Sequence, residues 1–168
     1  MAITRLGGAN AITGTIPTSV APGQGKVLQV VRTYDANASS HIETTSTSLT
    51  ASGIQASITP IKSGNLILVD FGSTMVDHTG SSQDGYGRMY QKIGSGSIAA
   101  MASSHNYHIG YIDNGSNRYA PFSFSGSYTA TSTDTLLYEP YIKSPSGGTF
   151  RLVHENASYA LTLTEVEQ

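Results

Sequence analysis

Five histidines are the residues of this sequence with the widest range of possible chemistry. His105 and His108 are separated by two other residues, which would place their imidazoles on opposite faces of a strand or close together in a turn. A metal ion needs converging ligands with a third donor, which three copies of one histidine on a trimer axis would supply. We interpret them as ordinary polar histidines and predict no metal or other cofactor. The five are His41, His78, His105, His108 and His154.

The usual signatures of catalysis carry little weight in this chain. Serine is so abundant that a Ser-His-Asp combination is uninformative, and no Gly-x-Ser-x-Gly elbow is present. Gly85–Gly87 and Gly94–Gly96 are glycine-rich, but no predicted helix follows them, so they indicate turns rather than phosphate loops. Asp77, Asp84 and Asp113 lie in predicted loops, where their oxygens could hold calcium, but the spacing of an EF-hand is absent. We therefore predict that the protein is not an enzyme.

Tyrosine supplies most of the aromatic side chains. The chain has ten tyrosines, four phenylalanines and no tryptophan, so most tyrosines are expected to fill the core and interfaces. A flat ring with a hydroxyl group also suits sugar or protein recognition. Asn114-Gly115 is a strong hairpin signal, because both residue types accept positive φ. We predict a recognition patch around this hairpin, with a host-surface glycan as one partner: Tyr107, Tyr111, Asn114 and Tyr119.

Composition favours one all-β domain. The 168 residues are 38% hydrophobic and only 12% charged, with 18 glycines. This is typical of Thr-, Ser- and Gly-rich strands joined by short turns, and helix-forming windows are missing. Alternating runs separated by turn residues predict eight or nine strands of an antiparallel β-sandwich or jelly roll over residues 26–168.

Charge and cysteine content exclude several classes of function. The net charge is −2 and no basic run is present, so nucleic-acid binding has little electrostatic support. The absence of cysteine excludes disulfides and zinc–thiolate sites. No apolar run is long enough for a signal peptide or a membrane span, so we expect synthesis in a cytoplasm and no membrane insertion.

The longest apolar run, Gly64–Val76, is predicted to be the central strand. One face carries Ile67, Val69 and Phe71, and the other face is also apolar. We predict that this second face, with Leu66, Leu68 and Val76, is the interface of a homotrimer. The alternative is a central strand that loops of its own chain cover.

Residues 1–25 are predicted to form an extended N-terminal arm. They carry little charge, many small residues and two prolines, and their apolar side chains follow no regular period. We expect the arm to become ordered against a partner, and the alternative is a floppy terminus. The predicted arm contacts are Ile3, Leu6, Ile12 and Ile16.

Three segments together resemble a group of small virion proteins of tailed phages, frequent in marine phages. These segments are Gly25–Val31 (GKVLQVV), Thr59-Pro60 with Asn65–Val69, and Ala160–Val166 (ALTLTEV). The resemblance covers about residues 23–167 of the sequence. Where the family pattern has Ser-Lys, this chain has Ser63-Gly64, with the basic residue at Lys62.

The resemblance implies a trimeric jelly-roll knob exposed on the capsid or tail surface of a bacteriophage virion. Such proteins serve as head decoration or cement proteins, head fibres, tail fibres or receptor-binding tips in host attachment, and the family brings no catalytic motif. The implied partners are two further copies of the chain and a major capsid protein or tail protein. We expect head decoration or head fibre first and a tail fibre or tip second. The alternative of another class is a carbohydrate-binding or glycan-degrading module. An enzyme of this kind should present paired carboxylates in a cleft, and the acidic residues here are scattered singly.

Overall fold

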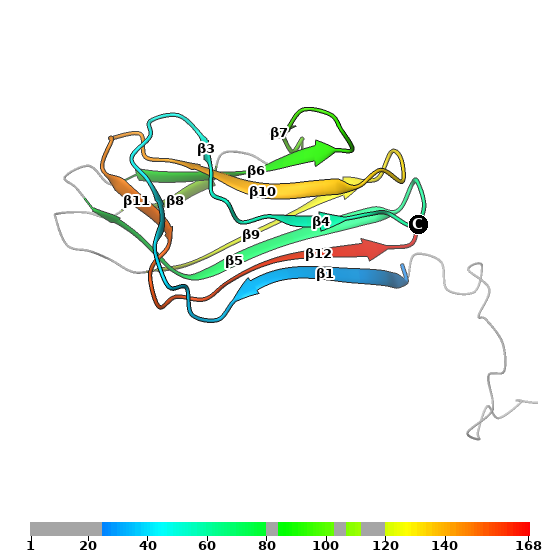
Figure 1. Cartoon of the computed structure of the whole chain (residues 1–168), viewed down its shortest axis with the longest axis horizontal. Helices are drawn as coiled ribbons and strands as arrows, with labels where there is room; N and C mark the ends of the chain where they lie inside the picture. The colour runs from blue at the N-terminus through cyan, green and yellow to red at the C-terminus, as the bar shows by residue number, and fades with distance from the viewer. Residues whose placement is uncertain (1–24, 80–83, 103–106, 112–119) are drawn as a thin grey trace, which may run out of the picture.

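The computed structural model describes the chain over residues 25–79, 84–102, 107–111 and 120–168, with only the backbone described at residues 78, 79, 84, 107–111 and 120. Every strand in these ranges belongs to one of two antiparallel sheets, and no helix occurs within them. The two sheets lie one above the other as a sandwich (Figure 1). The predicted all-β sandwich is therefore confirmed.

The first sheet is built around the long central strand. Four strands lie side by side in the order β1-β12-β5-β9. At the end of β5, β11 pairs with its last residues, and β2 pairs with β11. In pairing order these strands are β1 (Val27–Asp35), β12 (Tyr159–Val166), β5 (Leu66–Thr79), β9 (Ala120–Thr129), β11 (Thr149–Val153) and β2 (Ile42–Thr44).

The second sheet has two long strands at its centre, and short strands flank them. Pairs of short strands lie beside each of the long ones, β3 and β4 along β10, and β7 and β8 along β6. The members are β10 (Leu136–Lys143), β6 (Asp84–Ile93), β3 (Thr50–Ala51), β4 (Ala56–Ile58), β7 (Ala99–Ala100) and β8 (Tyr107–Tyr111). Of the twelve described strands four have two or three residues, so eight strands (12 − 4) have five or more.

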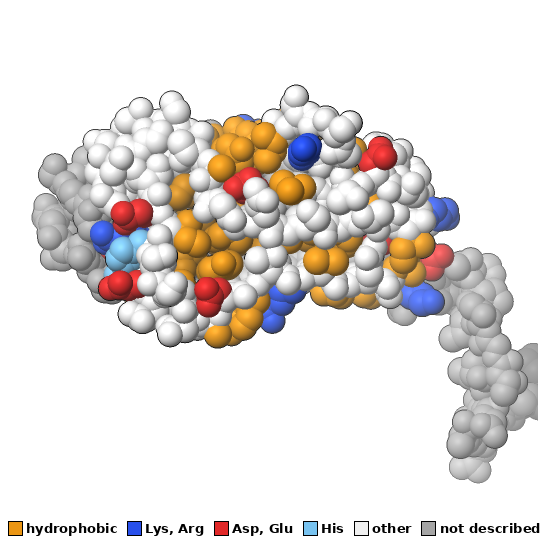
Figure 2. Space-filling model, in the orientation of Figure 1, with side chains coloured by type: hydrophobic (Ala, Val, Ile, Leu, Met, Phe, Trp, Pro, Cys, Tyr) orange, Lys and Arg blue, Asp and Glu red, His pale blue; other side chains and the backbone are white. Residues whose placement is uncertain are grey.

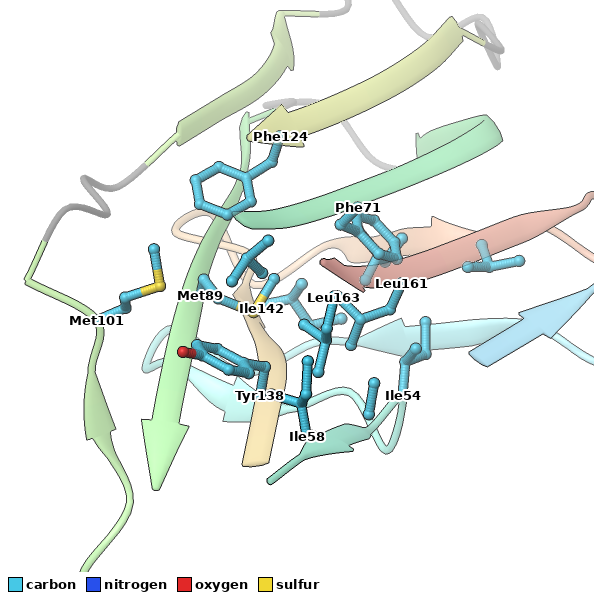
Figure 3. Close-up of a cluster of buried hydrophobic side chains, with 14 of the residues drawn as sticks. Ile54, Ile58, Phe71, Met89, Met101, Phe124, Tyr138, Ile142, Leu161 and Leu163 are labelled. Carbon is cyan, nitrogen blue, oxygen red and sulfur yellow. The ribbon is translucent and has the colours of Figure 1, made fainter. Parts of the chain in front are cut away.

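The core lies between the sheets and follows from alternation along the strands. Leu161 and Leu163 of β12 and Ile67 and Val69 of β5 are all fully buried, because every second residue of a strand points to the same face. Figure 3 shows side chains of both sheets meeting in this layer, with Tyr138 of β10 among them.

The prediction that Val76 shares a face with Leu66 and Leu68 is wrong. The pairing of β5 with β9 shifts in register between Ser73 and Val76. An extra residue at such a bulge reverses the alternation, since the side-chain period of a strand is two. Val76 consequently points into the core, where it is 5% exposed, while Leu66 and Leu68 stay on the outer face.

Pro140 lies in the central strand β10, opposite the gap between the two short strands β4 and β3 that pair with one edge of it. β10 pairs with β4 up to Tyr138 and with β3 from Tyr141 onwards. The carbonyl of Pro140 accepts a hydrogen bond from the backbone N–H of Ser52, in the loop between these short strands. Because the N and O of a residue in an antiparallel strand face the same neighbour, the missing N–H of proline falls at this gap.

Candidate functional site

Most residues of the two predicted contact regions lie outside what the structure describes. The arm residues Ile3, Leu6, Ile12 and Ile16 fall in 1–24, and Asn114 and Tyr119 fall in 112–119. Tyr107 and Tyr111 belong to β8, where the backbone alone is described. The arm and the hairpin patch therefore stay predictions.

An apolar patch lies on the outer face of the first sheet, at the end where residue 25 enters the domain. Val30 is directly opposite Thr164, which is opposite Leu68, and in the next row Val166 is opposite Leu66. Val30 is 58% exposed, and Leu66, Leu68 and Val166 are half-buried. We call the following set the outer patch: Val27, Val30, Leu66, Leu68 and Val166.

Beyond the outer patch the same face becomes polar. Arg32 follows on β1, and Asp70 on β5 accepts a hydrogen bond of 2.6 Å from Ser125 of β9. Tyr34 comes next on this face of β1, and its ring centroid lies 4.3 Å from the guanidinium of Arg32. The outer patch is therefore confined to one end of the sheet rather than spread along it.

A buried carboxylate fastens this end of the domain. Glu165 is fully buried and accepts hydrogen bonds from Asn65 Nδ2 at 2.6 Å, from the Ile61 backbone N–H at 2.8 Å and from Gln29 Nε2. Burial alone raises the pKa of Glu165, but these bonds, with a further one from the Lys62 backbone, outweigh it and hold the pKa below its ordinary value. The group joins β1, β12 and the turn before β5, and thus has a structural role.

A second charged cluster lies at the opposite end of the sandwich. Arg151 of β11 binds Glu43 Oε2 at 2.7 Å and the buried Asp77 Oδ2 at 3.0 Å. Burial lowers the pKa of Arg151, but the two carboxylates outweigh this and raise it. Nearby, the rings of His41 and His154 meet edge to face at 4.5 Å. Figure 2 shows acidic, basic and histidine side chains gathered at this end.

This cluster has the geometry of an ion-pair network. Both carboxylates are bound to the guanidinium, and His41 Nδ1 accepts a hydrogen bond of 2.9 Å from the backbone N–H of Glu155. Within the described ranges no three His, Cys, Asp or Glu side chains converge as metal ligands would. Asp77, placed in a loop by the sequence, is in fact a buried strand residue paired with Arg151.

The outer face of the second sheet carries a row of aromatic and basic side chains that sequence reasoning missed. Tyr90 of β6 and Tyr141 of β10 stack with centroids 4.0 Å apart and an interplanar angle of 18°. The Nζ of Lys143 lies 5.2 Å from the ring centroid of Tyr86, its cross-strand partner. Between the two tyrosines of β6, Arg88 faces Tyr141.

We call this set the tyrosine row. All its members are half-buried, in keeping with side chains that stand on the outside of a central pair of strands. The pKa of Tyr141 is raised above its ordinary value, mainly by burial and then by the charge of Glu139 and the neighbouring Tyr90. The alternating pattern Tyr-x-Arg-x-Tyr-x-Lys at 86–92 was the available signal, since period two puts these residues on one face. The tyrosine row consists of Tyr86, Arg88, Tyr90, Lys92, Tyr141 and Lys143.

A groove of about 380 Å³ lies beside β6 and β7. Its lining is uncharged, so it has no carboxylate, imidazole or amine that could act as a general base. Its lining residues are Gln91, Ile93, Gly96, Ser97, Ala99, Ala100, Ala102 and Tyr128.

Comparison with known proteins gives a structural neighbour and no family. No family model and no curated protein matches the chain. A chain in the structure of infectious bursal disease virus, Gx strain, is 12% identical with a TM-score of 0.38, covering 86% of this chain and 37% of that one. Such a score carries no functional argument, so function has to be argued from the residues. Among the described residues, no helix is long and apolar enough to cross a membrane.

Proposed function

We propose that this chain is a structural protein of a tailed-phage virion, a trimeric knob on the virion surface that its N-terminal arm attaches. Head decoration or a head fibre is the proposed location. The sequence resemblance to small phage virion proteins supports this proposal, and so does the sandwich of two antiparallel sheets.

The observation that carries the proposal is the position of the outer patch. Apolar side chains that are exposed together on a sheet face favour burial against another protein surface. Val30 and Val27 are 58% and 56% exposed, and they lie across β12 from the half-buried leucines of β5. A second copy of the chain would cover Leu66 and Leu68, as the sequence predicted for these two residues.

The outer patch also lies where the predicted arm begins. The backbone N–H of Glu167 donates to the Lys26 carbonyl at 2.9 Å, so both ends of the domain lie together, as Figure 1 shows. A trimer that assembles through this end would bring three arms close together. Ordering each arm costs conformational entropy, and three linked arms recover affinity through avidity.

Immunogold electron microscopy of purified virions tests the proposed location. An antibody against the domain is expected to place gold over the head, which would make the capsid shell the partner of the arm. Gold at the tail would favour the second candidate, a tail fibre or receptor-binding tip. Virions free of gold would overturn the virion proposal.

A further inference from the structure

We propose that the tyrosine row binds an acidic polysaccharide of the uronate type, whose sugar rings carry carboxylates. This binding surface lies on the sheet opposite the outer patch, so it remains accessible in a trimer that assembles through that patch. The inference goes beyond a virion location, because binding by the purified chain does not depend on where the protein is displayed.

The rings provide the first element of such a site. Tyr90 and Tyr141 hold each other parallel, and each ring keeps one face that the other does not cover. The C–H face of a sugar packs on a tyrosine face while the phenol hydroxyl contacts sugar hydroxyls. Since the stack fixes both side chains beforehand, binding costs little side-chain entropy.

Charge provides the second element and selects an anionic sugar. The tyrosine row has three bases, Arg88, Lys92 and Lys143, in a chain whose net charge is −2. Among the side chains that the structure describes on this face the acid is Glu139, which is 3% exposed, and its two oxygens already accept hydrogen bonds from the Gly53 N–H and Gln55 Nε2, each at 2.9 Å. These described side chains therefore have an excess of two positive charges (3 − 1).

Arg88 adds a guanidinium on a half-buried side chain to this surface. Its Nε is buried without a hydrogen-bond partner, so a ligand would have to pair with its two terminal nitrogens. A guanidinium pairs well with a carboxylate because two parallel N–H groups match its two oxygens. A uronate carboxylate above Arg88 would therefore lie between the rings of Tyr86 and Tyr90.

The shape of the face suits an extended chain. The neighbours of the stacked rings are small, since Ala51 is opposite Tyr141 and Ala100 is opposite Tyr90. From Tyr86 to Lys92 the row extends over roughly 20 Å at the usual rise per strand residue, long enough for several sugar units.

Calorimetric titration of the purified full-length chain tests the inference with three polymers. Polygalacturonate carries both rings and carboxylates, poly-L-glutamate carries carboxylates without sugar rings, and dextran carries uncharged sugar rings. We expect polygalacturonate to bind at least tenfold more tightly than either of the others at the same salt concentration. Absence of polygalacturonate binding, or equal binding of poly-L-glutamate, would overturn the inference.

Variants connect the binding to these residues. Tyr90→Ala and Arg88→Gln are each expected to weaken polygalacturonate binding at least fivefold, with the fold checked by circular dichroism. Tyr34→Ala is the matched control, because Tyr34 also lies beside an arginine, on the other sheet. An equal loss in the control would locate the binding elsewhere and refute the site. Gold labelling of virions is a separate readout, so failure of the proposed location leaves this result standing.

Discussion

Asn65 donates a hydrogen bond of 2.6 Å to Glu165, one hundred residues away in the sequence, and both side chains are fully buried. This contact fixes the start of the central strand β5 against the end of the last strand β12. A buried carboxylate with several donors stabilises a fold only while it remains charged. Its energetic role can therefore be measured by varying pH.

Replacing the carboxylate by an amide is expected to destabilise the domain near neutral pH. In Glu165→Gln an amide N–H₂ group faces existing donors, at a cost of about 2 kcal/mol in the free energy of unfolding. The folded-state pKa of Glu165 lies below its ordinary value of 4.5, so its contribution is present above that pH and is lost as the pH falls through the folded pKa. The difference from wild type should thus shrink on acidification.

Urea unfolding of both proteins over a pH series checks this prediction. Glu167→Gln is the matched control, because Glu167 is two residues further on and exposed, and it should leave the free energy of unfolding nearly unchanged. A difference for Glu165→Gln that stays constant down to strongly acidic pH would contradict the proposed role of the charge.

Tyr138→Phe is expected to stabilise the domain. The Tyr138 hydroxyl is buried and has no hydrogen-bond partner, and in Figure 3 it points towards the Met101 side of the core. Removing an unsatisfied buried hydroxyl should raise the free energy of unfolding by about 1 kcal/mol. Thermal melting compares this variant with Tyr128→Phe, which loses a bond of 3.1 Å to Thr131 and should not gain stability. A lower melting temperature for Tyr138→Phe would show that the hydroxyl has a partner.

Gly85→Ala is expected to destabilise the domain, because a methyl group there would lie 2.2 Å from the ring of Phe150. That ring is 1% exposed in the core and cannot move away without repacking its neighbours. We expect a loss of about 1–3 kcal/mol, measured by urea unfolding.

A control and a rescue accompany this prediction. Gly72→Ala should be tolerated, because its methyl group would meet one atom, the Phe122 carbonyl oxygen, at 3.8 Å. Gly85→Ala should cost less stability in a Phe150→Leu background than in the wild type, because the smaller leucine side chain leaves room for the added methyl group. Strict additivity would rule out the steric explanation.

Local alternation was enough to predict most of the strands. The run Leu136–Lys143, which ends before the turn residues Ser144–Gly148, is typical of a strand, and β10 has those bounds. Ile54, Ala56 and Ile58 alternate with Gln55 and Ser57, which predicts a half-buried strand, and all three are buried. Both predictions depend on a period of two within one short segment, which tertiary contacts reinforce rather than override.

The features that sequence reasoning missed arise from contacts between distant segments. The bulge after Ser73 depends on how β9 pairs with β5, so it has no signature within β5 itself. The stack of Tyr90 on Tyr141 requires the register of β6 against β10, which a single strand does not encode. The donors around Glu165 likewise come from two separate segments, β1 and the turn before β5.

A charge placed on the outer patch is expected to prevent assembly. Leu68 lies across Thr164 from Val30, so Leu68→Asp would set an unpaired carboxylate among apolar side chains of the proposed interface. Size-exclusion chromatography with light scattering should give the mass of three chains for the wild type and of one chain for the variant. Leu137→Asp is the matched control, because Leu137 is also half-buried on an outer sheet face, but on the second sheet, and it should stay trimeric. A wild-type protein with the mass of one chain would refute the interface at Leu66 and Leu68. A Leu68→Asp variant that is still a trimer would show that the interface lies on another face.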